Sequence, residues 1–370
     1  MTKVLGIVNI EPSYVKVEGI EDYRPISASS FMGRYRVIDF VLSNFTNSGI
    51  YNVEVQVKNR PRSTIEHIKN TDYNINTKRG KIRVLYGEKP VLNEVYNTDV
   101  ASLTANLEFI EETDAAYVIL APSHFVYTMD YQELLDAHIA SGNDITMLYQ
   151  NVTTANEDFL KCDALEIDEN GKVTNMYVNQ GKVKRAKISL ETYVMSKKTF
   201  IDLIYAAKSI SALYSFSDAL RDTFEDFKVG AYLHSGYAAC ISSLNAYYKA
   251  SMEIKEAKQL DKMFADKWPI YTATNDTCPT VYKKGAKVEN SIVGNGCQIE
   301  GTVINCVVGR NVVVKEGAVI KDSILMPDVL INKNVKMTKT VVDRLAIVTH
   351  VKELNGTDEQ PLYVKRGDRI

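Results

Sequence analysis

The sequence lacks long apolar runs and lacks an excess of either charge. No apolar stretch approaches the roughly 18 residues that a membrane-spanning helix needs. A formal net charge of −2 and a pI near 6.3 give no electrostatic basis for binding nucleic acid or an anionic membrane surface. We therefore expect a globular protein whose partners include neither nucleic acid nor a membrane.

Metal-binding and redox motifs are also missing. The five cysteines are odd in number and contain no C-x-x-C pair, and the five histidines contain no H-x-x-x-H pair. The opening stretch MTKVLGIVNI has too short an apolar run, too quickly followed by charge, for a signal peptide. These features predict free thiols, no zinc site and a cytoplasmic location.

What is present falls into two patterns, of which the first covers residues 1–245. Short apolar runs rich in Val, Ile and Tyr are typical of strands, and stretches with helical spacing lie between them. This alternation predicts an α/β domain whose mostly parallel sheet has helices on both faces. The predicted strands are 4–8, 53–57, 117–121 and 145–149, and the predicted helices are 40–48, 63–69, 101–112 and 131–140.

The second pattern begins at residue 280, after a predicted helical linker over 246–279. Apolar residues recur every six positions, with glycines and asparagines between them. A sheet strand would give period two and a helix 3.6, whereas period six predicts a β-helix over 280–370 with a C-terminal tail. A small antiparallel sandwich is the alternative. The repeating positions are Val307, Val313, Val319, Leu325, Ile331 and Met337, preceded in an offset register by Val281, Val293 and Ile299.

One stretch narrows the assignment: residues 33–50 read GRYRVIDFVLSNFTNSGI. It resembles the signature G-[KR]-[FY]-R-[IV]-I-D-F-x-L-S-N-x-x-N-S-G-I of ADP-glucose pyrophosphorylases, the glucose-1-phosphate adenylyltransferases. Further matches follow in the family's order at 129–131, 248–252 and 290–301. The resemblance covers nearly the whole chain. It implies a Rossmann-like nucleotidyltransferase domain followed by a left-handed parallel β-helix of hexapeptide repeats.

The resemblance also implies a reaction whose machinery can be sought in the sequence. Family enzymes join glucose 1-phosphate to ATP, which requires backbone amides around the triphosphate, basic side chains, and carboxylates that hold Mg²⁺. Where the family has a G-G-x-G-x-R-L loop, residues 6–16 read GIVNIEPSYVK. Pro12 removes an amide and Glu11 places an anion where phosphate would lie, so no triphosphate cradle is predicted.

The family's metal and sugar-phosphate residues are replaced as well. The aspartate of S-G-D-H aligns with Ser123, and that of W-[RK]-D-V-G-T aligns with Cys240, a soft donor where Mg²⁺ favours oxygen. The lysine of F-x-E-K-P aligns with Asn179, and a glycine of S-M-G-x-Y aligns with Glu191. We therefore predict no catalytic residue, metal or cofactor in this chain, with Mg²⁺ only in a catalytic partner.

This combination resembles the non-catalytic GlgD-type subunit that accompanies a catalytic ADP-glucose pyrophosphorylase. The resemblance implies a regulatory subunit in glycogen biosynthesis that forms a heterotetramer with the catalytic chain; a homo-oligomer is the alternative. It also implies an anionic effector, for which Arg24, Arg34 and Arg36 are the predicted contacts. The competing interpretation is that these arginines pair with local carboxylates such as Asp39.

Three other functions remain open at this point: a divergent but active sugar-phosphate nucleotidyltransferase, a hexapeptide-repeat acyltransferase, and a sensor of sugar nucleotides that needs no partner. Such acyltransferases use a histidine in a coil of the β-helix, and no histidine lies between residues 280 and 340. We interpret the basic run at 78–81 as a solvated loop rather than a phosphate site.

Overall fold

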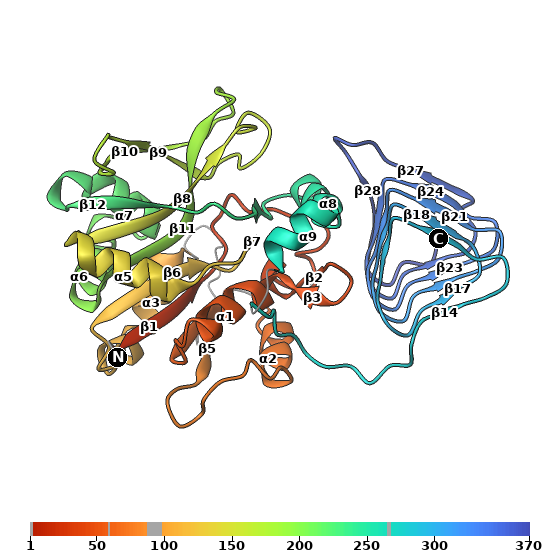
Figure 1. Cartoon of the computed structure of the whole chain (residues 1–370), viewed down its shortest axis with the longest axis horizontal. Helices are drawn as coiled ribbons and strands as arrows, with labels where there is room; N and C mark the ends of the chain where they lie inside the picture. Colours follow the sequence, from red (N-terminus) through yellow and green to blue (C-terminus); the bar gives the residue numbers. More distant parts are fainter. Residues whose placement is uncertain (1–2, 58–59, 87–97, 265–267) are drawn as a thin grey trace. The chain divides into compact units, whose positions relative to one another are not determined.

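The computed structural model describes residues 3–57, 60–86, 98–264 and 268–370. By their mutual contacts they form two compact units (Figure 1). The first comprises Met1–Val15, Phe40–Cys240 and Asp266–Tyr271, and the second comprises Lys16–Asp39, Ile241–Ala265 and Thr272–Ile370. The sequence-based division differs from this one, because it assigned residues 16–39 to the α/β domain.

The first unit is built on a nine-stranded sheet, and all four predicted strands are confirmed within it. The strand order is β10-β9-β11-β6-β1-β4-β5, and β8 pairs with both β11 and β12. Strands β6, β1, β4 and β5 are parallel neighbours, whereas β11 runs antiparallel to β6. The bounds are β1 Val4–Asn9, β4 Val53–Val57, β5 Ile82–Tyr86, β6 Tyr117–Pro122, β8 Ile145–Val152, β9 Asp163–Ile167, β10 Val173–Val178, β11 Ala186–Ser196 and β12 Val229–Leu233.

Helices cover this sheet because alternate residues of its strands are apolar on both faces. In β1, Leu5 and Ile7 pack into one core with α3, α4, α6 and α7, whereas Gly6 lies against Phe45 of α1 on the other face (Figure 1). The helices are α1 Val37–Asn47, α2 Arg62–Lys69, α3 Asp99–Ala105, α4 Leu107–Glu111, α5 Tyr131–Ser141, α6 Lys197–Ile210 and α7 Phe216–Asp222.

The predicted helix over 101–112 is wrong as a single element, because it breaks between α3 and α4 at Asn106. The side-chain amide of Asn106 donates to the Ser102 carbonyl at 2.9 Å and to Oε1 of Gln56 on β4 at 3.1 Å. An asparagine that bonds in this way competes with continued helix formation. The other three predicted helices are confirmed.

The second unit contains the β-helix, whose three parallel five-stranded sheets stack coil on coil. It is a left-handed parallel β-helix, as the sequence predicted. One sheet consists of β14 Val281–Tyr282, β17 Gln298–Ile299, β20 Val313–Val314, β23 Leu330–Ile331 and β26 Ile347–Val348. The next consists of β15 Lys287–Glu289, β18 Thr302–Ile304, β21 Val319–Lys321, β24 Lys336–Thr338 and β27 Glu353–Asn355. The third consists of β16 Ile292–Val293, β19 Val307–Val308, β22 Ile324–Leu325, β25 Thr340–Val342 and β28 Leu362–Val364.

The uniform six-residue register is wrong in detail. Val314 pairs with Ile331 and Ile331 with Val348, so these coils advance by seventeen residues rather than eighteen. One corner of each such coil is therefore a residue shorter than the other two. As a result Val314 and Ile320 fill the interior, whereas the predicted Val313 and Val319 are only half-buried.

The rest of the second unit consists of a hairpin, β2 Ser30–Phe31 and β3 Tyr35–Arg36, and two helices, α8 Leu244–Glu253 and α9 Ala257–Met263. The two helices fall where the helical linker was predicted. None of the helices within the described ranges is long and apolar enough to cross a membrane.

Replacing Gly33 by alanine should destabilise the second unit by roughly 2 kcal/mol or more. Gly33 turns the hairpin with φ of +70°, and a Cβ atom there would lie 2.6 Å from the Val308 carbonyl oxygen. Gly367→Ala is the control, because Gly367 lies in the same unit, has φ of +74° and has open space around it, so it isolates the strain. Hydrogen exchange of the β-helix amides measures the loss, and equal losses in both variants would refute the steric contribution.

Candidate functional site

The two positions aligned with the family's metal carboxylates lie next to each other in the first unit. Ser123 follows the carboxyl end of β6, and Cys240 ends β13 (Ala238–Cys240). Strand β13 pairs with β7 (Phe125–Tyr127) so that Cys240 is opposite Phe125, two residues beyond Ser123. Both side chains are buried, and the Ser123 hydroxyl has no hydrogen-bond partner among the described residues. The fold therefore brings these positions together, as it would for a pair of metal ligands.

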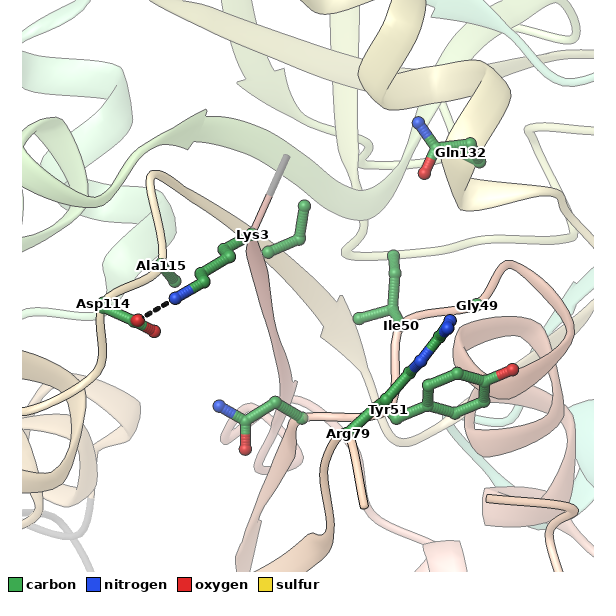
Figure 2. A pocket seen from close by; sticks show the side chains of 10 residues that line it. Lys3, Gly49, Ile50, Tyr51, Arg79, Asp114, Ala115 and Gln132 are labelled. Atoms are coloured by element: carbon green, nitrogen blue, oxygen red, sulfur yellow. Dashed lines mark hydrogen bonds and ion pairs between the residues drawn. The ribbon is translucent and has the colours of Figure 1, made fainter. Parts of the chain in front are cut away.

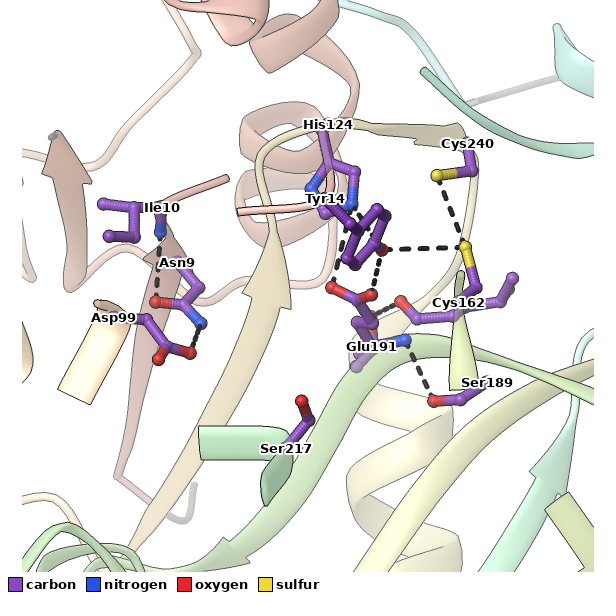
Figure 3. Close-up of polar contacts among 12 residues, drawn as sticks. Asn9, Ile10, Tyr14, Asp99, His124, Cys162, Ser189, Glu191, Ser217 and Cys240 are labelled. Carbon is purple, nitrogen blue, oxygen red and sulfur yellow. Dashed lines mark hydrogen bonds and ion pairs between the residues drawn. The ribbon is translucent and has the colours of Figure 1, made fainter. Parts of the chain in front are cut away.

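A tyrosine from the loop after β1 occupies the space beside them. The Tyr14 hydroxyl donates a short hydrogen bond to Oε1 of Glu191 and lies 3.2 Å from Nε2 of His124 (Figure 3). It also lies 3.6 Å from Sγ of Cys162, whose sulfur is in turn 3.5 Å from that of Cys240. Five side chains from separate segments thus form one connected, largely buried group, which we call the Tyr14 cluster.

Burial holds two members of this cluster, Glu191 and His124, in their neutral forms. It raises the pKa of Glu191 to about 8, against an opposing hydrogen bond from Tyr14 and with added repulsion from Asp163 and Asp99. Burial also lowers the pKa of His124 to about 3. At neutral pH Glu191 therefore retains its proton and His124 is uncharged, so their 3.7 Å approach is not an ion pair.

The backbone at Glu191 has a conformation suited to glycine, the residue that the family has at this position. Its φ is +48°, in the left-handed region that glycine adopts without strain, and β11 changes register between Ser189 and Thr192. The Glu191 amide donates to the Ser189 hydroxyl at 3.1 Å. The chain therefore retains the local fold of a glycine motif but places a buried carboxyl group on it.

The donors at this site do not fit Mg²⁺. This ion takes oxygen ligands, usually carboxylates and waters, whereas Ser123 offers a neutral hydroxyl and Cys240 a buried thiol. Glu191 is engaged by Tyr14. No group of three or more His, Cys, Asp or Glu side chains within the described ranges is placed to hold a metal ion.

The loop after β1 is fastened internally rather than open to a phosphate. The Asn9 amide donates to Asp99 at 2.9 Å, and the Ile10 N–H donates back to Asn9 Oδ1 at 3.0 Å (Figure 3). Asp99 also accepts the Phe216 N–H at 3.0 Å. These bonds fix the loop at its start, and the contacts of Tyr14 fix its end.

Asn179, at the family's sugar-phosphate lysine position, is likewise engaged by the protein. It is 2% exposed, and its amide donates to the carbonyls of Ala155 at 2.9 Å and Phe159 at 3.0 Å. Its Oδ1 accepts the Gly181 N–H at 3.0 Å. Asn179 therefore holds neighbouring loops together and presents no cation to a phosphate.

Of the three predicted effector contacts in the second unit, Arg24 is buried in an ion pair. Its Nη2 lies 2.7 Å from Oδ1 of Asp343, whose Oδ2 accepts the Tyr363 hydroxyl at 2.6 Å. Arg24 is 4% exposed and Asp343 fully buried, yet Nε and Nη1 of Arg24 have no hydrogen-bond partner in the part of the chain that the structure describes. The carboxylate that pairs with it comes from the β-helix, not from the neighbouring sequence.

Arg34 and Arg36 flank Tyr35 in the β2–β3 hairpin. The Arg34 guanidinium is exposed and lies 5.7 Å from the centre of the Tyr35 ring. The Arg36 N–H donates to Asp39 Oδ2 at 2.8 Å. Beside them lies Arg310 of the β-helix, whose pKa is lowered by burial and then by the charge of Arg34. Sequence reasoning missed Arg310, since nothing local marks an arginine in a repeat as a neighbour of residue 34.

Comparison with known proteins places these observations in a family. Residues 25–257, more than half of the chain, match the family described as nucleotidyl transferase. The chain belongs to the nucleotidyl transferase family. Residues 278–360 match the family described as GlmU-like, C-terminal hexapeptide.

Individual relatives agree with this membership. The chain is 31% identical to the glycogen biosynthesis protein GlgD of Bacillus subtilis over 99% of its own length and 96% of the relative's. It is 30% identical to the GlgD of Geobacillus stearothermophilus with the same coverage of both chains. It is also 31% identical to a glucose-1-phosphate adenylyltransferase of Lachnospira eligens over 78% of its own length and 68% of the relative's. The resemblance drawn from residues 33–50 is therefore confirmed.

Proposed function

We propose that this chain is a non-catalytic regulatory subunit of a glucose-1-phosphate adenylyltransferase, which assembles with a catalytic paralogue in ADP-glucose synthesis for glycogen. The observation that carries the proposal is the Tyr14 cluster, which includes Cys240 at one of the family's metal positions and adjoins Ser123 at the other. The similarity to proteins named for glycogen biosynthesis supports the pathway.

The size of the expected loss of catalytic rate favours a non-catalytic subunit over a slow enzyme. Loss of one preorganised electrostatic group typically costs about 10²–10³ in rate. Here both metal positions and the sugar-phosphate lysine position have changed, and Asn179 is held by backbone carbonyls. Such losses are not additive, but two of them would remove most useful turnover.

The regulatory part of the proposal places an anionic effector near Arg34 and Arg36. Arg310 adds a third guanidinium, whose charge is disfavoured by burial and by Arg34. A phosphate bound among them would relieve this repulsion through charge-assisted hydrogen bonds. Arg24 remains a candidate contact through its two unpaired nitrogens, although its ion pair with Asp343 gives it a separate structural role.

Assembly is proposed as a heterotetramer of two catalytic and two regulatory chains, with Mg²⁺ held only by the catalytic chain. The first coil of the β-helix supports association, because β14, β15 and β16 each have a neighbouring strand on one side only within the described ranges. Val281 and Tyr282 on β14 are exposed there.

The decisive experiment measures ADP-glucose synthesis from ATP, glucose 1-phosphate and Mg²⁺ by three samples: this chain, a catalytic homologue from the same cell, and their mixture. We expect no turnover by this chain, and a mixture that exceeds the homologue or shifts its effector response. A homologue whose metal-binding aspartate is replaced by asparagine is the control, and its mixture with this chain should be silent.

Two results would overturn the proposal. Appreciable turnover by this chain, alone or with the disabled homologue, would make it a divergent but active nucleotidyltransferase. A mixture that behaves as the sum of its parts, with no association in analytical ultracentrifugation, would remove the regulatory role.

A further inference from the structure

A pocket lies at the end of the sheet opposite the Tyr14 cluster. It has a volume of about 580 Å³ and opens at the amino ends of β1 and β6, next to the segment between α1 and β4 (Figure 2). Its polar lining consists of Lys3, Tyr51, Asn52, Arg79, Asp114 and Gln132. Its volume is within the range of about 300–1,000 Å³ typical of small-molecule sites.

The charges around this pocket leave one cation unmatched. Lys3 and Asp114 pair with each other, and Figure 2 shows this pair on the side of the pocket away from Arg79. The Arg79 guanidinium is exposed and has neither a hydrogen bond nor an ion pair with any described residue. The pocket therefore carries a net positive charge at Arg79.

Two further polar groups at this wall are also unpaired within the described ranges. These are the hydroxyl of Tyr51 and the side-chain amide of Asn52, both on half-buried residues. Gln132 donates its Nε2 hydrogen to Asp136 at 2.8 Å, which leaves its Oε1 available. The lining thus has more free donors than acceptors, which favours a ligand group rich in acceptors.

The backbone that carries these groups is held in place. The Arg79 and Gly80 amides donate to the Asn76 carbonyl at 2.8 and 3.1 Å, which closes a turn. This turn packs so tightly on the neighbouring segment that a Cβ atom at Gly80 would lie 2.5 Å from the carbonyl carbon of Tyr51. Arg79 and Tyr51 are therefore presented by one fixed wall.

We propose that this pocket binds a small phosphomonoester of sugar size or larger. Its phosphate would be held by the Arg79 guanidinium and the Tyr51 hydroxyl, because a guanidinium fork matches phosphate oxygens bidentately. The hydroxyl groups of its organic part would meet Asn52 and Gln132. The proposal gives a binding role to Arg79 within residues 78–81, which from the sequence alone we interpret as a solvated loop. The site lies in the first unit, is separate from the proposed effector site at Arg34, and does not depend on the proposed function.

The test is isothermal titration calorimetry of the full chain with ribose 5-phosphate, AMP and inorganic phosphate, with ribose and adenosine as unphosphorylated controls. We expect at least one ester to bind and Arg79→Ala to weaken it about tenfold or more. Lys78→Ala is the matched control, since it removes the same charge one residue away from the lining. It should change the affinity by less than about twofold, as should Arg34→Ala.

Four outcomes would overturn the inference. The first is that neither ester binds, and the second is that inorganic phosphate binds as tightly as the esters, which would leave only an ion-binding surface. The third is that Lys78→Ala weakens binding as much as Arg79→Ala. The fourth is that Arg34→Ala abolishes binding while Arg79→Ala leaves it unchanged, which would move the ligand to the second unit. Arg79 is exposed, so its variant should fold, which circular dichroism verifies.

Discussion

Arg24→Ala is expected to lower the free energy of unfolding of the second unit by about 3–5 kcal/mol. The substitution would leave Asp343 charged, fully buried and without its partner at 2.7 Å. Asp343 keeps the Tyr363 hydroxyl on Oδ2 and the Arg344 N–H on Oδ1, but two neutral donors do not compensate a buried carboxylate. Hydrogen exchange of residues 272–370 is the appropriate measurement, because the only tryptophan, Trp268, belongs to the first unit.

Two further variants make this prediction specific. Arg344→Ala breaks a pair with Asp328 in which both side chains are about one-third exposed, so we expect a loss of about 1 kcal/mol or less. The double variant Arg24→Met/Asp343→Asn removes both charges and should recover a large part of the stability lost in Arg24→Ala. If Arg24→Ala weakens the binding of an effector without lowering the free energy of unfolding, Arg24 is a ligand contact and not a structural residue.

Much of the fold could be predicted because its periodicities are local. Alternation of strands and helices indicated the parallel sheet, and all four predicted strands lie in it. Period six indicated the β-helix, but a single fixed register could not show that one corner of a coil is shorter, as the pairing of Val314 with Ile331 demonstrates. The break at Asn106 was also hidden, because its cause is a hydrogen bond to Gln56, fifty residues earlier.

The candidate site was only partly predictable. Ser123, Cys240 and Asn179 could be located because each ends a strand or replaces a motif residue. Tyr14 carried no such signal, because its partners Glu191 and Cys162 lie far away in the sequence. A carboxyl group where the family has glycine was visible, but its burial was not. Contacts between distant segments therefore account for most of what the sequence could not show.

Raising the pH from about 4.5 to 8 should destabilise the first unit by about 3–4 kcal/mol relative to a Glu191→Gln variant. Below pH 4.5, the ordinary pKa of a glutamate, the carboxyl group is protonated in both the folded and the unfolded chain. Between these pH values the unfolded chain loses this proton while the folded chain retains it, because burial raises the pKa of Glu191 to about 8. Above pH 8 both states are ionised and the difference stays constant.

His124 acts in the opposite sense and over a different pH range. Its pKa is about 3 in the folded chain and 6.5 for an exposed imidazole, so the unfolded chain gains a proton first as the pH falls below 6.5. The first unit should therefore also lose stability toward acid. Glu191→Gln leaves the loss of stability toward low pH unchanged and removes only the loss of stability toward higher pH. The contributions of Glu191 and His124 can therefore be told apart.

Urea unfolding followed by Trp268 fluorescence between pH 4 and 9 measures this dependence in the first unit. Glu157→Gln, at an exposed glutamate, is the control and should leave the pH profile unchanged. Tyr14→Phe supplies a stricter test. The Tyr14 hydrogen bond lowers the pKa of Glu191, so its removal should raise that pKa further and extend the loss of stability to higher pH. Identical profiles for the wild type and Glu191→Gln would mean that Glu191 is solvated and that the Tyr14 cluster does not exclude water from the site.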